Sequence, residues 1–158
     1  MTVYLVQHAE AMREEEDPQR PLTPRGWQDI RAVAAFLARS GRVPVARIVH
    51  SGKTRAQQTA EVLAEALRPS QGVTAGQDLD PLADPRPWVE RLQASTEAMM
   101  LVGHLPHLSK VAALLLCQDE TRQPVAFQMG GVVCLQRNAT GQWAVQWMVV
   151  PALLAEGG

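Results

Sequence analysis

Val3-Tyr4-Leu5-Val6-Gln7-His8 joins a continuous apolar run to two polar residues. An unbroken apolar run of this length is typical of a strand that is buried on both faces. Such strands occur in parallel sheets that carry helices on either side. The stretch therefore predicts an α/β fold in which His8 lies just beyond the carboxyl end of a buried strand.

Strands and helices alternate along the chain after this run. Thr23 is a good N-cap with Pro24 at the first helical position, and Ser40-Gly41 ends that helix. Further strands are expected at 46–49, 73–75 and 98–102, and further helices at 54–67, from 85 toward 92 and from about 106 to 116. This alternation predicts a three-layer α/β/α fold with a mostly parallel central sheet.

The C-terminal part of the chain departs from this alternation. Strand-like runs at 131–135 and 143–150 flank the turn residues Asn138-Ala139-Thr140-Gly141. Asn and Gly between two such runs are typical of a β-hairpin. We therefore expect an antiparallel hairpin at the edge of the sheet. Because the chain has no repeat or linker, we also expect residues 1–158 to form a single domain.

The composition excludes several kinds of partner. The net charge of −1 provides no field that would attract nucleic acid or an anionic membrane surface. No stretch approaches the ~20 apolar residues of a membrane span, and no signal peptide is evident. We therefore expect a cytoplasmic protein that binds neither nucleic acid nor membrane. Cys117 and Cys134 are too few for a disulfide scaffold or a zinc site, and we expect two buried thiols and no metal.

Chemically competent side chains follow three of the apolar strands, each at the carboxyl end. His8 follows the first strand, Ser51 and Arg55 follow the second, and Gly103-His104 follows the third. Ligands of open α/β sheets bind beyond the carboxyl ends of the strands. A single histidine in such a place is more often structural. The coincidence at three strand ends is what predicts a functional site.

These side chains suit phosphoryl transfer through a phosphorylated histidine. A neutral imidazole is a competent nucleophile near neutral pH because its ordinary pKa is about 6.5. The transferred group spreads its charge over three oxygens, so it needs fixed cations and N–H donors. Arg55 offers a permanently charged fork in the first turn of its helix, and His104, when protonated, would bind another oxygen. We predict His8 as the nucleophile.

Four motifs resemble the histidine phosphatase superfamily and come in that family's order. They are Leu5-Val6-Gln7-His8-Ala9-Glu10, Leu22-Thr23-Pro24-Arg25-Gly26, Ser51-Gly52-Lys53-Thr54-Arg55-Ala56-Gln57-Gln58-Thr59-Ala60 and Val102-Gly103-His104-Leu105-Pro106. The short length, and Met129-Gly130-Gly131-Val132-Val133 before the hairpin, are similar to its SixA-type phosphohistidine phosphatase branch. The resemblance implies a metal-independent phosphatase without a cofactor. It matches His8 to the phosphorylated histidine, and Arg55 and Gly103-His104 to the family's other catalytic positions.

The residue before the nucleophile departs from the family pattern. The family usually has arginine there, and this chain has Gln7. Gln7 still donates an N–H to a phosphoryl oxygen but supplies no charge, so we expect weaker phosphate binding, on the scale of about 1.5–3 kcal/mol for one charged hydrogen bond. Lys53 is the nearest cation in sequence that could compensate, although a solvated lysine is the ordinary interpretation. We assign Gln7, Ser51 and Gly103 to substrate binding.

The general acid is the second departure. Larger relatives carry a Glu or Asp that protonates the leaving oxygen, whereas 76–81 offers only Asp78 and Asp80, both of them ordinary turn residues. Asp80 is the candidate acid. An alkoxide leaving group needs a proton, but the imidazole of a phosphohistidine departs readily near neutral pH. The shortage of candidate general acids therefore favours a substrate with an N–P bond.

We predict a phosphatase that dephosphorylates phosphohistidine on a protein such as a phosphotransfer domain. One alternative is a phosphomonoesterase whose partner is a small phosphorylated molecule. Another is a weakly active or non-catalytic phosphate-binding module, because Gln7 replaces the usual arginine.

Overall fold

The computed structural model describes residues 1–155 and shows strands alternating with helices. The strands are β1 (Thr2–Gln7), β2 (Arg47–His50), β3 (Val73–Ala75), β4 (Met99–Gly103), β5 (Val132–Arg137) and β6 (Trp143–Val149). The helices are α1 (Pro24–Ser40), α2 (Thr54–Leu67), α3 (Arg86–Ala94), α4 (His107–Cys117) and the short 3-10 helix η1 (Pro151–Leu153). Every element expected from the sequence is present, with ends displaced by one or two residues.

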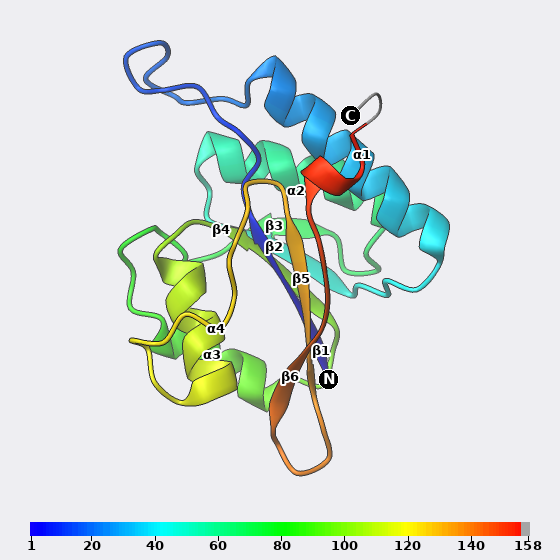
Figure 1. Ribbon diagram of the computed structural model, residues 1–158, viewed down its shortest axis with the longest axis vertical. Helices are drawn as coiled ribbons and strands as arrows, with labels where there is room; N and C mark the ends of the chain where they lie inside the picture. Colours follow the sequence, from blue (N-terminus) through cyan, green and yellow to red (C-terminus); the bar gives the residue numbers. More distant parts are fainter. Residues whose placement is uncertain (156–158) are drawn as a thin grey trace.

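The strands form one sheet in the order β3-β2-β4-β1-β5-β6. The β3, β2, β4 and β1 strands run parallel to one another, whereas β5 is antiparallel to β1 and β6 is antiparallel to β5. The predicted mostly parallel sheet with an antiparallel hairpin at its edge is confirmed (Figure 1). The parallel strands therefore present their carboxyl ends at one edge of the sheet.

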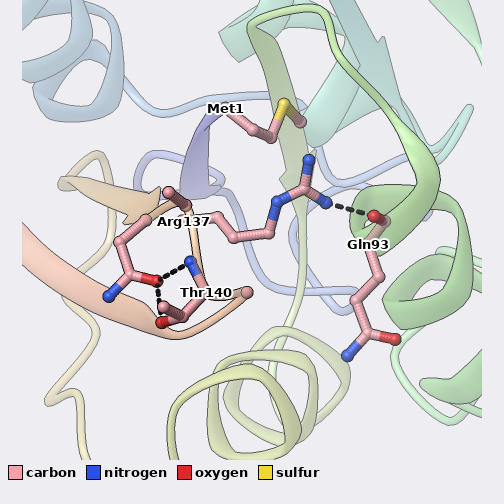
Figure 2. Close-up of a pocket in the computed structure, with 7 residues that line it drawn as sticks. Met1, Gln93, Arg137 and Thr140 are labelled. Carbon is pink, nitrogen blue, oxygen red and sulfur yellow. Dashed lines mark hydrogen bonds between the residues drawn. The ribbon is translucent and has the colours of Figure 1, made fainter.

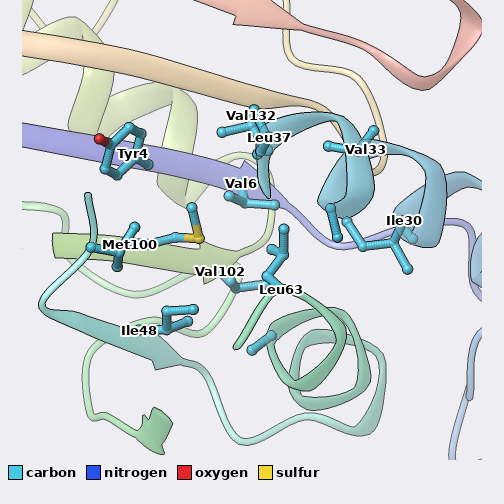
Figure 3. Packing of buried hydrophobic residues seen from close by; sticks show 14 of the residues in the cluster. Tyr4, Val6, Ile30, Val33, Leu37, Ile48, Leu63, Met100, Val102 and Val132 are labelled. Atoms are coloured by element: carbon cyan, nitrogen blue, oxygen red, sulfur yellow. The ribbon is translucent and has the colours of Figure 1, made fainter. Parts of the chain in front are cut away.

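Helices cover both faces of the sheet, α1 and α2 on one side and α3 and α4 on the other (Figure 1). A hydrophobic core lies on each face of the sheet, and alternate residues of β1 pack into each of them. Tyr4 and Val6 pack on the α1 and α2 side, and Val3 and Leu5 pack on the α3 and α4 side. Figure 3 shows the first of these cores. Each fully buried aliphatic side chain contributes about 1.5–3 kcal/mol, so the apolar run that predicted the fold also stabilises both layers.

The start of α1 is held against the segment that follows β1. The Thr23 hydroxyl accepts a hydrogen bond from the Gly26 N–H at 3.0 Å, and the Thr23 N–H donates to the Glu10 carbonyl at 3.0 Å. A Cβ on Gly26 would lie 2.1 Å from that same Glu10 carbonyl oxygen. Glycine is therefore required here, and α1 fixes the backbone immediately beyond His8.

The two thiols differ from the prediction. Both cysteines are free, but only Cys134, on β5, is buried, and Cys117 is exposed at the last position of α4. The apolar stripe of α4 consists of positions such as Leu108, Val111 and Leu115, and Cys117 lies off that stripe. The prediction for Cys117 is wrong because apolar neighbours in sequence do not fix the side of a helix on which its last residue lies. Within residues 1–155, no helix has the length and apolar character needed to cross a membrane.

Candidate active site

The carboxyl edge of the sheet brings two of the predicted histidines together. His8 follows β1 and His104 follows β4, and these strands are parallel neighbours. The His8 N–H donates to the Gly103 carbonyl at 3.0 Å, which joins the two strand ends directly. The imidazole rings lie 5.1 Å apart between centroids, and their exposed fractions are only 8% and 2%. The arrangement is a close pair of buried imidazoles.

The hydrogen bond of His8 fixes its tautomer. Nδ1 lies 2.7 Å from the Ala9 carbonyl oxygen, and a carbonyl only accepts, so Nδ1 carries the hydrogen. Burial lowers the pKa of His8 to about 4; the bond to Ala9 opposes this change, and the charges of Arg55 and Arg20 reinforce it. At neutral pH the ring is therefore uncharged, and Nε2 carries the free lone pair.

His104 is also neutral at neutral pH. Its Nε2 lies 2.6 Å from the Ser51 hydroxyl oxygen, while its Nδ1 is buried and has no hydrogen-bond partner among residues 1–155. Burial, followed by the charge of Arg55, lowers the pKa of His104 to about 3. The protonated His104 considered from the sequence is thus not the form present at neutral pH, because the ring is buried and lies near the charge of Arg55.

Arg55 is the second residue of α2, and the backbone around it is tied to His8. The Thr59 hydroxyl donates to the Arg55 carbonyl at 2.8 Å and accepts from the Ala9 N–H at 3.0 Å. The Arg55 Nε is buried and has no hydrogen-bond partner in the part of the chain that the structure describes. A buried charged donor without an acceptor is costly unless a ligand supplies one. The ligand indicated by a guanidinium is an anion.

The other predicted residues lie at or near this edge. Gln7 is half-buried at the end of β1 and pairs in register with Gly103. Ser51 accepts a hydrogen bond from the Lys53 N–H at 3.3 Å, and the charge of Lys53 contributes to the lowered pKa of His104. Gln7, Gly103 and Ser51 are thus placed beside the histidines, as their assignment to binding requires.

Asp80 forms no hydrogen bond to this group among residues 1–155. Its carboxylate is exposed in the segment between β3 and α3. Its charge acts instead on His107, a fully buried residue in the first turn of α4 whose pKa burial lowers. The role of Asp80 as a general acid stays a prediction.

Sequence reasoning missed Arg20. This half-buried residue lies between β1 and α1, and its charge lowers the pKa of both His8 and Arg55. The segment 13–20 is polar and irregular, and nothing in its pattern distinguishes Arg20 from Arg13. Only its adjacency to the motif that starts at Leu22 could have drawn attention to it. In residues 1–155, no cluster of His, Cys, Asp or Glu side chains is arranged to hold a metal.

A large hollow lies at the opposite edge of the sheet (Figure 2). Its volume is about 740 Å³, and Met1, Gln93 and the 137–141 turn line it. The Arg137 guanidinium donates to the carbonyls of Gln93 and of Ser95, the latter at 3.1 Å, at the C-terminus of α3. Its ring partner is Trp143, whose centroid lies 5.6 Å from the guanidinium carbon. Arg137 is therefore a cap for α3, and this hollow is structural although it is large.

Fold and site together define an α/β protein with two buried histidines and the buried Nε of Arg55 at the carboxyl edge of its sheet. The chain belongs to the histidine phosphatase superfamily: the family model for branch 1 of that superfamily matches residues 3–80. The resemblance seen in the four sequence motifs is thereby confirmed.

Relatives match almost the whole chain. The phosphohistidine phosphatase SixA of Escherichia coli strain K12 is 27% identical over 98% of this chain and 96% of its own length. The structure of the protein histidine phosphatase SixA complexed with tungstate has a TM-score of 0.85 at 25% identity, over 98% of this chain and all of that one. The α-ribazole phosphatase of Shigella flexneri shares the fold, with a TM-score of 0.73 at 16% identity over 96% and 97% of the two chains.

Proposed function

We propose that this chain is a phosphatase that takes a phosphoryl group onto Nε2 of His8 and then passes it to water. One observation carries the proposal: the Nδ1–H of His8 is bound to the Ala9 carbonyl, which leaves Nε2 as the free lone pair of a neutral, buried ring. Membership of the histidine phosphatase superfamily and the match to SixA over the whole chain support the same chemistry without a metal or cofactor.

The first step forms a phosphorylated His8. Nε2 attacks phosphorus in line with the leaving group; the Nε2–P bond forms, and the bond from phosphorus to the leaving atom breaks with its electron pair. Because Nδ1 keeps its hydrogen, the phosphorylated ring carries a positive charge, which the Ala9 carbonyl stabilises. The orientation of the nucleophile is thus set by its nearest backbone neighbour.

The second step returns the enzyme to its starting state. A water oxygen attacks phosphorus, the Nε2–P bond breaks, and its electron pair returns to Nε2. Both hydrogens of the water leave on the released phosphate, so His8 ends neutral with its hydrogen still on Nδ1. No group of the protein has to change its protonation permanently during the cycle.

Arg55, His104 and Ser51 bind the phosphoryl oxygens in both steps. Arg55 offers the buried Nε–H that has no partner among residues 1–155. Nε2 of His104 can exchange its bond to the Ser51 hydroxyl for a bond to a phosphoryl oxygen, and a dianion beside the ring favours its protonated form. These donors stabilise the charge that spreads over the oxygens as the group is transferred.

The substrate we assign is phosphohistidine on a protein such as a phosphotransfer domain. When its free nitrogen carries a hydrogen, the imidazole of that residue departs neutral and needs no acid. An exposed Asp80 without a bond to either site histidine is consistent with this substrate. The alternative substrate is a small phosphomonoester. The α-ribazole phosphatase of Shigella flexneri has the same fold. The cytoplasm as location and a single domain over residues 1–158 stay predictions.

The test is transfer of labelled phosphate from a phosphohistidine-carrying phosphotransfer domain. We expect acid-labile label on His8 during turnover, and loss of activity by about four orders of magnitude or more in His8→Ala. His50→Gln is the matched control, because His50 is also buried at this edge but its Nδ1 only accepts from the Gly52 N–H. Wild-type turnover by His8→Ala would refute the proposal.

Asp80→Asn separates the two substrate classes. We expect this variant to hydrolyse phosphohistidine at a rate close to that of the wild type. If phosphomonoesters were turned over faster than phosphohistidine, and this activity fell in Asp80→Asn, the small-molecule alternative would hold instead.

A further inference from the structure

Arg20 adopts a backbone conformation that non-glycine residues rarely adopt. Its φ is +48°, in the left-handed region, where a side chain with a Cβ is strained. Such strain persists only where the surrounding structure holds the residue in place, and it is concentrated at functional sites. The conformation of Arg20 therefore indicates that its surroundings hold it in place and that its side chain has a functional role.

Backbone contacts on both sides hold Arg20 beside the end of β1. Its N–H donates to the Asp17 carbonyl at 2.9 Å, and its Nε donates to the Met12 carbonyl at 2.9 Å. The Met12 N–H in turn donates to the Pro21 carbonyl at 2.8 Å, next to a bridge between Ala11 and Leu22. The guanidinium is thus anchored through Nε, and among residues 1–155 its two terminal nitrogens form no hydrogen bond.

Within the part of the chain that the structure describes, no carboxylate pairs with this guanidinium. Among residues 1–155, Arg20 takes part in no ion pair, in contrast to Arg13 on the same segment, which is exposed and pairs with Glu16 at 3.0 Å. The charge of Arg20 reaches His8 and Arg55. Two guanidinium groups that lie close enough to affect one another repel unless an anion lies between them. The buried, unpartnered Nε of Arg55 indicates the same ligand.

We propose that Arg20 is a second guanidinium of the phosphoryl-binding site and supplies the positive charge that Gln7 lacks. The ligand is a tetrahedral oxyanion: the phosphoryl group of the substrate and the phosphate released. The proposal rests on the proposed function for the identity of that substrate. Lys53, the cation nearest in sequence, acts on His104 rather than on the nucleophile. Arg20 is therefore, besides Arg55, a cation whose charge reaches the nucleophile.

Binding of inorganic phosphate to the full chain tests this directly by calorimetry. We expect Arg20→Gln to raise the dissociation constant by about ten- to a hundredfold, the range for one charge-assisted hydrogen bond. Arg13→Gln, the matched control on the same segment, should change it less than about twofold, as is usual for an exposed ion pair. Equal phosphate affinity in Arg20→Gln and the wild type, or a loss in Lys53→Gln without one in Arg20→Gln, would overturn the proposal.

Two further variants separate binding from folding. Arg20→Gly relieves the left-handed strain, so we expect it to unfold at or above the wild-type temperature and yet bind phosphate as poorly as Arg20→Gln. Gln7→Arg should restore most of the lost affinity in the Arg20→Gln background and gain less in the wild type. Wild-type affinity in Arg20→Gly, or the same gain from Gln7→Arg in both backgrounds, would show that Arg20 does not bind the anion.

Failure of this inference is distinguishable from failure of the proposed function. If the wild type binds phosphate through Arg20 but never forms phosphorylated His8, the catalytic proposal fails and the binding role of Arg20 stands. If His8 is phosphorylated during turnover while Arg20→Gln leaves phosphate binding unchanged, only the role of Arg20 fails. A pH profile adds a readout that a merely structural residue would not move. Removing the charge of Arg20 should shift the acid limb of kcat/KM to higher pH.

Discussion

The two edges of the sheet each hold a guanidinium group beside a strand end, and they use it differently. At the end of the sheet where the turn between β5 and β6 lies, Arg137 donates to the backbone carbonyls at the end of α3, beside a large hollow. At the carboxyl edge, the buried Nε of Arg55 has no partner in the part of the chain that the structure describes. The contrast teaches that an unsatisfied donor locates a ligand better than the volume of a cavity does. Three measurements test this contrast.

The largest effect is expected at Arg55. Arg55→Gln keeps a side chain of related shape but removes the charge, and loss of one preorganised donor at such a site usually costs about 10²–10³ in kcat. Steady-state turnover of a phosphohistidine protein measures it. The contrast would fail if Arg137→Gln, at the other edge, lowered turnover as much as Arg55→Gln.

A second effect, on stability rather than on turnover, is expected from the pH. His8 and His104 have pKa values of about 4 and about 3 in the folded protein, against about 6.5 in the unfolded chain. The unfolded chain therefore binds more protons below pH 6.5, and the free energy of unfolding should fall as the pH decreases from about 6.5 toward 4. Each pKa unit of difference corresponds to about 1.4 kcal/mol.

Urea unfolding at several pH values measures this slope. His8→Gln and His104→Gln should each flatten it, because each variant removes one buried group that must be neutral in the folded state. A slope equal to that of the wild type in both variants would show that these histidines are not the groups that titrate.

The smallest effect is expected at Arg137, beside the turn between β5 and β6. Arg137→Gln removes the charged donor that caps the C-terminus of α3, which should cost about 1–2 kcal/mol of stability through the lost hydrogen bonds and helix-dipole interaction. Thermal unfolding measures this loss, and turnover below the melting temperature should stay at the wild-type value. A variant that kept its stability but lost activity would make the hollow beside Arg137 functional after all.

The sequence was informative wherever one local rule determined position. Because parallel strands end at one edge, the placement of His8 and His104 beyond two such strands was enough to predict their proximity. The run 3–6 predicted two buried faces because its residues are apolar without alternation. Thr23 and Pro24 marked the start of α1 to the residue.

Contacts between distant residues could not be predicted in this way. The bond between Ser51 and His104 joins positions 53 residues apart, and it depends on the exact course of two loops. Arg20 has a left-handed backbone conformation, and its Nε is bound to the Met12 carbonyl. Neither condition leaves a mark in composition or periodicity. The wrong prediction for Cys117 has the same origin, since the end of a helix fixes which way its last side chain points.

The bridge between Ala11 and Leu22 has a further consequence. It closes the base of the segment that joins β1 to α1, so the exposed tip at 13–16 projects away from the rest of the chain (Figure 1). Chain length at the tip of a loop with a closed base can change at little entropic cost. Insertions or deletions at this tip would therefore change the surface that a partner protein contacts and leave Arg20 and His8 in place.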